Sequence, residues 1–110
     1  MKSTLFAGLT LLIINNAAHA QVIDPVPDVG AGARRAAVCF ACHNTNGIAR
    51  IPGVPDLAGQ NSDYLEAALH AYRGGKTRQN PTMNAMAKPL SDRDIVNIAA
   101  YFGSLPRVAD

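Results

Sequence analysis

The stretch Cys39-Phe40-Ala41-Cys42-His43 contains both cysteines of this 110-residue chain and one of its three histidines. Two thiols three positions apart, followed directly by an imidazole, concentrate sulfur and nitrogen ligands in five residues. Two cysteines are too few for the disulfide framework on which very small exported domains usually rely. This stretch is therefore the first place to look for a group that could complete the interior of a short chain.

The pattern C-x-x-C-H is the attachment signature of c-type haem. Two thiols at a helix end can each add to one vinyl group of the same porphyrin, which holds His43 under the iron as its proximal ligand. A thioredoxin-like redox pair would need a strand–helix setting that the sequence lacks. A zinc site with His70 would use adjacent Cys42 and His43, which is awkward for one tetrahedron, and a second C-x-x-C is missing. A plain structural disulfide is the third alternative. The histidine joined to the pair favours haem.

The N-terminus has the pattern of an export signal. Lys2 precedes an apolar run over residues 5–14, and Ala18-His19-Ala20 fits a signal-peptidase site. The run is shorter than the roughly 20 apolar residues that span a bilayer, so we expect no stable membrane insertion. Residues 1–20 are thus predicted to be a signal peptide, with an uncleaved anchor or a buried helix as alternatives. Export would place the cysteines in the oxidising periplasm.

The composition of the whole chain narrows its functional class. It is 48% hydrophobic and 16% charged, which is typical of a folded domain. A formal charge of +2 without a clustered basic face argues against nucleic-acid binding. The length excludes a dinucleotide-binding fold or a barrel enzyme. We expect an extended leader over residues 21–30 and one domain over residues 31–110.

Apolar periodicity predicts three helices, over Gly30–Ala41, Asp63–Arg73 and Asp92–Phe102. The expected N-terminal caps are Ser62 or Asp63 for the second helix, and Ser91 with Asp94 for the third. No segment alternates with the period of a strand. The fold class is therefore all-α.

Two stretches, 44–61 and 74–90, are rich in Gly, Pro and Asn and are predicted to be loops. Loops of this length are unusual in a small domain unless they surround something. Three short helices with few aromatic residues also make a marginal core. Both observations indicate that a bound group fills the interior.

The order and spacing of several further motifs resemble the class I c-type cytochromes, in particular single-haem bacterial cytochromes and each half of the periplasmic dihaem carriers. The resemblance extends over about residues 32–105. Besides the C-x-x-C-H stretch it is carried by Val54-Pro55-Asp56-Leu57-Ala58-Gly59-Gln60, Met83-Asn84-Ala85-Met86, Leu90-Ser91-Asp92 and Ala99-Ala100-Tyr101-Phe102. It implies a cytochrome c-like fold with three main helices and long loops around one covalent haem c.

A second axial ligand would have to come from Met83, Met86 or His70, and the residues alone leave the two methionines open. His70 is expected to be a surface or half-buried helix residue. The resemblance implies Met83, which stands eight residues before Ser91, with Met86 as the runner-up. Ligation by His43 and a methionine would leave no open iron position, which indicates electron transfer rather than oxygen activation or enzyme chemistry.

The resemblance also implies roles around the ligands. The carbonyl of Pro55 would accept the second N–H of the proximal histidine, as metal-bound histidines require. Leu57 would pack on the porphyrin, and Gly59 would turn the chain away. Gly32 would let the first helix cross the third near Tyr101.

The function predicted from these features is a periplasmic single-electron carrier. Redox protein partners would dock transiently at the exposed haem edge, where charge affects the encounter rate more than the affinity. The basic residues expected near that edge are Arg50, Arg73, Lys76, Arg78 and Lys88. They could form a docking ring, pair with haem propionates or simply be solvated. The alternative functions are a cytochrome subunit of an exported dehydrogenase complex and a gas-binding haem sensor.

Overall fold

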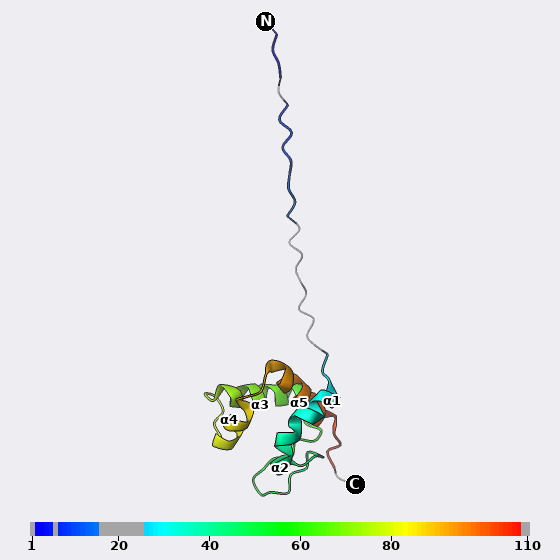
Figure 1. Cartoon of the computed structure of the whole chain (residues 1–110), viewed down its shortest axis with the longest axis vertical. Helices are drawn as coiled ribbons and strands as arrows, with labels where there is room; N and C mark the ends of the chain where they lie inside the picture. The colour runs from blue at the N-terminus through cyan, green and yellow to red at the C-terminus, as the bar shows by residue number, and fades with distance from the viewer. Residues whose placement is uncertain (1, 6, 16–25, 109–110) are drawn as a thin grey trace.

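The computed structural model describes residues 2–5, 7–15 and 26–108, and within these residues every regular element is helical. The elements in chain order are α1 (Val29–Arg35), η1 (Ala36–Cys39), α2 (Phe40–His43), α3 (Ser62–Gly74), α4 (Pro81–Ala87) and α5 (Asp92–Ser104). Figure 1 shows the helices gathered into one body. The predicted all-α fold class is confirmed.

The first predicted helix is composite. Asp28 caps α1 through a hydrogen bond from the Ala31 N–H to its carboxylate, at 2.9 Å. The chain then tightens into the 3₁₀ segment η1 and relaxes into the single turn of α2. It stops at Asn44, the one non-glycine residue of the described chain with a positive φ, 62°. The C-x-x-C-H stretch therefore lies on the last turns of a helix.

Helices α1 and α5 cross where Gly32 meets the backbone of Asn97. A Cβ atom on Gly32 would overlap the Asn97 carbonyl oxygen and lie 3.1 Å from the Cβ of Tyr101. The Asn97 side chain fixes the same crossing, because its Oδ1 accepts from the Asp28 N–H at 2.9 Å. The predicted role of Gly32 in a close crossing near Tyr101 is confirmed.

The structure corrects the predicted N-terminal cap of α3 and confirms that of α5. Helix α3 is capped by Asn61, whose Oδ1 accepts from the Tyr64 N–H at 3.1 Å, so the prediction of Ser62 or Asp63 was wrong by one residue or more. Asparagine is as good a cap as serine or aspartate, and it places Ser62 inside the first turn. Helix α5 begins with the predicted reciprocal box between Ser91 and Asp94.

The prediction of an uninterrupted loop over 74–90 was wrong, because residues 81–87 form α4. Asn80 caps this helix, accepting from the Met83 N–H at 3.0 Å, and Pro81 occupies its first turn. Proline is favoured there because its fixed φ suits a helix and its missing N–H would have had no partner. The Asn-Pro pair that we took as a loop signal is thus a helix start. The other stretch, 44–61, has no regular element.

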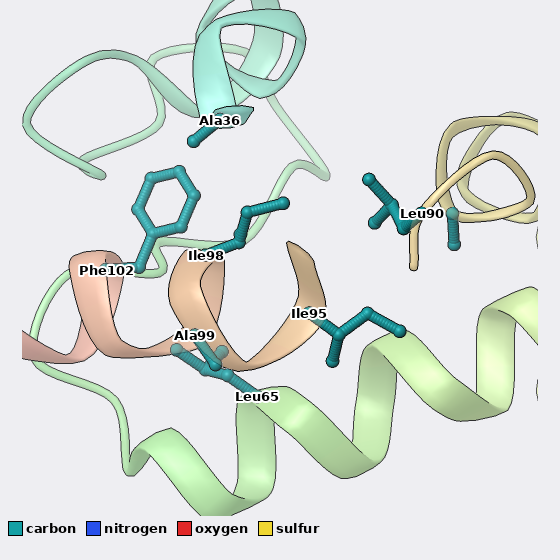
Figure 2. Packing of buried hydrophobic residues seen from close by; sticks show 8 residues of the cluster. Ala36, Leu65, Leu90, Ile95, Ile98, Ala99 and Phe102 are labelled. Atoms are coloured by element: carbon teal, nitrogen blue, oxygen red, sulfur yellow. The ribbon is translucent and has the colours of Figure 1, made fainter. Parts of the chain in front are cut away.

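The core lies between η1, α3 and α5 (Figure 2). Phe102, Ile98 and Ile95 of α5 are its largest fully buried side chains. Within residues 2–5, 7–15 and 26–108, the nine buried hydrophobic residues are Ala36, Ala58, Leu65, Ala87, Leu90, Ile95, Ile98, Ala99 and Phe102. Four of the nine are alanines, which bury little area, so the protein atoms alone stabilise this fold weakly.

The structure describes only part of the predicted signal peptide and leader. Residues 7–15 are extended, and the side chains of Leu9, Leu11 and Leu12 are largely exposed. The predicted cleavage site after Ala20 and residues 21–25 of the predicted leader lie outside the described residues. No helix in the described ranges has both the length and the apolar character needed to cross a bilayer.

Candidate functional site

The two thiols of the C-x-x-C-H stretch lie on one short piece of helix. Cys39 ends η1 and is half-buried, whereas Cys42 in α2 is exposed, and both are free. Burial raises the pKa of the Cys39 thiol, and the positive charge of Arg35 opposes this only in part. Redox-active dithiols have a lowered thiol pKa. The described chain also contains no strand, so it lacks the strand–helix setting of a thioredoxin-like redox pair.

His43 is buried, with 7% of its surface exposed, and its ring is oriented by a backbone carbonyl. Its Nδ1 lies 2.8 Å from the carbonyl oxygen of Pro55. Because a carbonyl can only accept, Nδ1 carries a proton, and Nε2 is the ring nitrogen that can offer a lone pair to a metal. Within the described residues Nε2 makes no hydrogen bond. The ring therefore presents one oriented nitrogen ligand, in the residue directly after Cys42.

Residues 47–58 close into a loop that holds Pro55 against His43. The carbonyl of Gly47 accepts from the N–H groups of Leu57 and Ala58, at 2.8 and 3.1 Å. This pairing needs glycine at position 47, because its φ is 70° and a Cβ there would lie 2.8 Å from the Ala58 nitrogen. Backbone contacts, rather than a helix, thus place the acceptor of the histidine.

The next residues lead the chain back to the core. Leu57 is half-buried and packs against the hydrophobic cluster. Gly59 has a φ of 68° and donates its N–H to the carbonyl of Phe102 at 3.0 Å, so the chain turns there onto α5. The contact of Leu57 with a porphyrin stays a prediction.

The two candidate methionines lie on α4. Met83 is half-buried near the start of the helix, and Met86, one turn later, is 42% exposed. In the view of Figure 1, α4 lies beside α3 at the left of the helical body, and α2 with the C-x-x-C-H stretch lies to the right of α4, below α1. The predicted ligands on the two sides of the iron thus come from separate parts of the fold.

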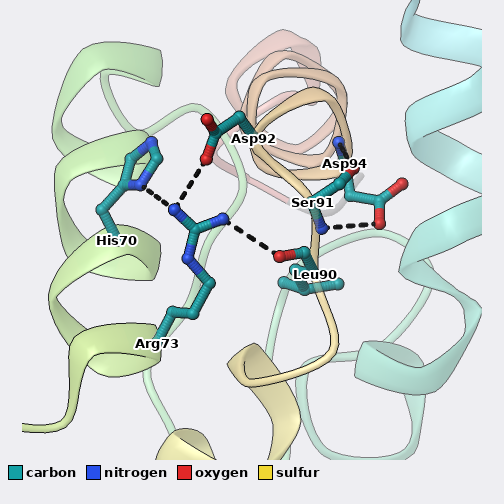
Figure 3. Close-up of polar contacts among 6 residues, drawn as sticks. All are labelled: His70, Arg73, Leu90, Ser91, Asp92 and Asp94. Carbon is teal, nitrogen blue, oxygen red and sulfur yellow. Dashed lines mark hydrogen bonds and ion pairs between the residues drawn. The ribbon is translucent and has the colours of Figure 1, made fainter.

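His70 belongs to a surface network, and sequence reasoning missed the rest of this network (Figure 3). Arg73 contacts the Nδ1 of His70 at 3.0 Å, the Oδ1 of Asp92 at 2.6 Å and the carbonyl oxygen of Leu90 at 3.0 Å. These partners are up to 19 positions away, and no local pattern marks them. In the described ranges no three or more His, Cys, Asp or Glu side chains form a group that could hold a metal.

Two of the five basic residues predicted near the site have structural partners. Arg73 is tied to the start of α5, as described above. The Arg78 guanidinium lies 4.7 Å from the ring centre of Tyr72 and 5.9 Å from that of Tyr64. Arg50, Lys76 and Lys88 are exposed and make no side-chain hydrogen bond within the described chain. Only these three remain as candidates for a free charged rim.

Sequence reasoning also missed Asn84, which follows Met83 directly. Its side-chain amide donates to the carbonyl oxygens of Tyr72 and Arg78, at 2.8 and 3.0 Å. These acceptors are backbone atoms of other elements, so the sequence carries no signal for them. An asparagine four residues after the cap of a helix is unremarkable by itself.

The donor set and the interior fit a c-type haem. Two free thiols and an oriented Nε2 lie within five residues, which matches covalent attachment with a proximal imidazole. The core is poor in large side chains, while Val38, Ile51 and Met86 keep 42–53% of their surface exposed. A large apolar group would bury surface of this kind.

Known cytochromes are similar to this chain in sequence. The family profile described as Cytochrome c matches residues 29–106. Cytochrome c-554(548) from Halomonas halodenitrificans is 43% identical over 79 residues, which cover 70% of this chain and 95% of the relative. Cytochrome c4 from Pseudomonas aeruginosa is 39% identical over 104 residues, 94% of this chain but 49% of the relative. The chain thus spans about half the length of its cytochrome c4 relatives.

Solved structures agree with these matches. Reduced recombinant cytochrome c4 from Pseudomonas stutzeri superposes with a TM-score of 0.69 at 38% identity, over 74% of this chain and 47% of that one. Cytochrome c4 from Acidithiobacillus ferrooxidans gives a TM-score of 0.62 at 29% identity, over 74% and 53% of the two chains. Fold, C-x-x-C-H stretch and sequence similarity lead to one conclusion: the chain belongs to the cytochrome c family, whose members transfer electrons.

Proposed function

We propose that this protein carries single electrons on one haem c, attached through Cys39 and Cys42 and ligated by His43 and Met83. The observation that carries the proposal is the buried His43 ring, whose Nδ1 is held by Pro55 and whose Nε2 is left as a ligand beside two free thiols. Bound haem would supply a one-electron iron couple. Met86 is the runner-up as second axial ligand.

The residues of the chain have distinct tasks in this proposal. Pro55 keeps the proton of His43 on Nδ1, which fixes the orientation and raises the basicity of the ligating nitrogen. Met83 offers a neutral, soft thioether, which raises the reduction potential. His43 and Met83 together would leave no iron position open to small molecules, which favours electron transfer over oxygen activation.

Two measurements on purified exported protein test the attachment and the ligands. The pigment should stay with the polypeptide in acidified organic solvent, and Cys39→Ser with Cys42→Ser should release it. Met83→Ala should abolish the iron–sulfur absorption band of the oxidised protein, while Met86→Ala should keep it. Rapid carbon monoxide binding by the reduced wild-type protein would contradict methionine ligation and support a gas sensor.

We further propose that the carrier acts in the periplasm and exchanges electrons with protein partners. The export pattern of residues 1–20 supports this location. A fixed subunit is the second candidate: a relative from Chlorobaculum tepidum, 33% identical over 69 residues, is named the cytochrome subunit of sulfide dehydrogenase. Purification under mild conditions separates the two, because a subunit would bring a larger partner chain with it and a free carrier would elute alone.

A further inference from the structure

Asn84 uses its side chain to join three segments around the start of α4. Its Nδ2 donates to the carbonyl of Tyr72 in α3 at 2.8 Å and to that of Arg78 in the connecting turn at 3.0 Å. Its Oδ1 accepts from the N–H of Asn80, the cap of α4, at 2.8 Å. Three of the four hydrogen bonds that an asparagine side chain can make are thus committed to backbone atoms.

Hydrogen bonds of the residues before and after Met83 in the sequence hold its backbone. Asn80 accepts from the Met83 N–H, and Asn84 accepts from the Asn80 N–H. In the usual capping box the side chain of the third helical residue returns the bond to the cap. Here that third residue is Met83, which has no good acceptor. The next residue supplies the bond, and the Met83 thioether is left free for another use.

We propose that Asn84 is a positioning residue for the methionine ligand: it fixes the first turn of α4 against α3, and so holds the Met83 sulfur toward the iron. The inference rests on the proposed role of Met83. The stretch 75–80 contains no helix, so without Asn84 the side-chain hydrogen bonds at the start of α4 would be reduced to the Asn80 cap. Looser backbone at Met83 increases the fraction of molecules in which the thioether leaves the iron.

The test uses the holoprotein with Asn84→Ala and the control Asn61→Ala. Asn61 caps α3, and its replacement removes the hydrogen bond of 3.1 Å from the Tyr64 N–H, which involves neither α4 nor its methionines. Asn84→Ala should weaken the iron–sulfur band, lower the potential and speed carbon monoxide binding roughly ten-fold, the effect of one to two net hydrogen bonds. Asn61→Ala should lower thermal stability and leave all three readouts at wild-type values.

A second variant covers the case in which Asn84→Ala fails to fold. Asn84→Asp keeps the shape and the acceptor for the Asn80 N–H but loses both donors, and its carboxylate faces the carbonyls of Tyr72 and Arg78. It should therefore weaken the band as well. Wild-type band, potential and carbon monoxide rate in a folded Asn84 variant would overturn the inference. If Met83→Ala kept the band, the ligand assignment itself would fall; if it lost the band while both Asn84 variants stayed normal, only the role of Asn84 would fall.

Discussion

The segments 44–61 and 75–90 both carry a predicted contribution to the iron site, and they are built by different means. The first has no regular element and is closed by backbone bonds to Gly47. The second contains α4 and is closed by the side chains of Asn80 and Asn84. The first orients a histidine on another element through a carbonyl, and the second presents its methionines directly.

The difference shows what each means of closure tolerates. A loop held by backbone pairing depends on the few positions where the chain must adopt a positive φ or approach itself closely. A helix held by caps depends on particular side chains, and each cap contributes about 1 kcal/mol. The first segment should therefore be sensitive at its glycines, and the second at its asparagines.

Gly47→Ala should have the largest effect, and Gly53→Ala is its matched control. Both glycines have a positive φ, 70° and 81°, but a Cβ at Gly47 would press on Ala58, whereas one at Gly53 would meet nothing within 4 Å. The strain alone costs about 1 kcal/mol, and the overlap should raise the loss for Gly47→Ala to about 3 kcal/mol. Urea unfolding of both variants measures this, and equal losses would show that the Gly47 contacts are not what closes the loop.

Asn80→Ala should destabilise the protein by about 1 kcal/mol through the lost cap of α4. Asn80→Asp keeps an acceptor for the Met83 N–H and adds a favourable charge at the helix start, so it should restore wild-type stability. Thermal unfolding of the two variants provides the measurement. A loss in Asn80→Asp as large as in Asn80→Ala would argue that the amide, rather than the cap, matters.

Features with a local sequence pattern could be predicted, whereas features that depend on contacts made by the fold could not. The three main helices and the Ser91–Asp94 box follow from local patterns and were predicted, whereas the Gly32 crossing was implied by the resemblance to class I c-type cytochromes. Helix α4 was missed because Asn-Pro suits both a turn and a helix start, and only packing against α3 distinguishes them. The roles of Asn84 and Arg73 depend on carbonyls brought close by the fold.

Acid should weaken the boundary between the second segment and α5. Hydrogen bonding from the Ser91 backbone N–H, with a further contribution from Arg35, lowers the pKa of Asp94 below its usual value of about 4. A lowered pKa in the folded state stabilises the protein above about pH 4, and this contribution is lost as the pH falls through the folded pKa. The carboxylate is partly solvated, so the loss should stay below about 1 kcal/mol.

Unfolding measured from pH 6 down to pH 3, a window set by about one to two units around the usual carboxyl pKa, checks the acid effect. Asp94→Asn should show a flatter decline than the wild type. Asp63→Asn, which removes a carboxylate from the first turn of α3 that makes no side-chain hydrogen bond in the described chain, should decline as the wild type does. Parallel curves for all three proteins would assign the acid sensitivity elsewhere.

Charge reversal should have the smallest effect on stability and would show which segment borders the docking face. Arg50 represents the first segment, and Lys76 and Lys88 the second; all three are exposed. Replacing each by Glu should slow oxidation by an anionic probe such as hexacyanoferrate(III) about two- to five-fold at low ionic strength, and the difference should vanish at high salt. Arg93→Glu, on α5 outside both segments, is the control.

A cationic cobalt(III) complex should reverse the sign of the rate change, so that the Glu variants react faster than the wild type. An effect confined to Arg50 would place electron exchange beside the loop that holds Pro55, whereas one confined to the lysines would place it beside α4. Equal rates for all variants would remove charge from the docking argument, leaving the apolar surface to guide partners.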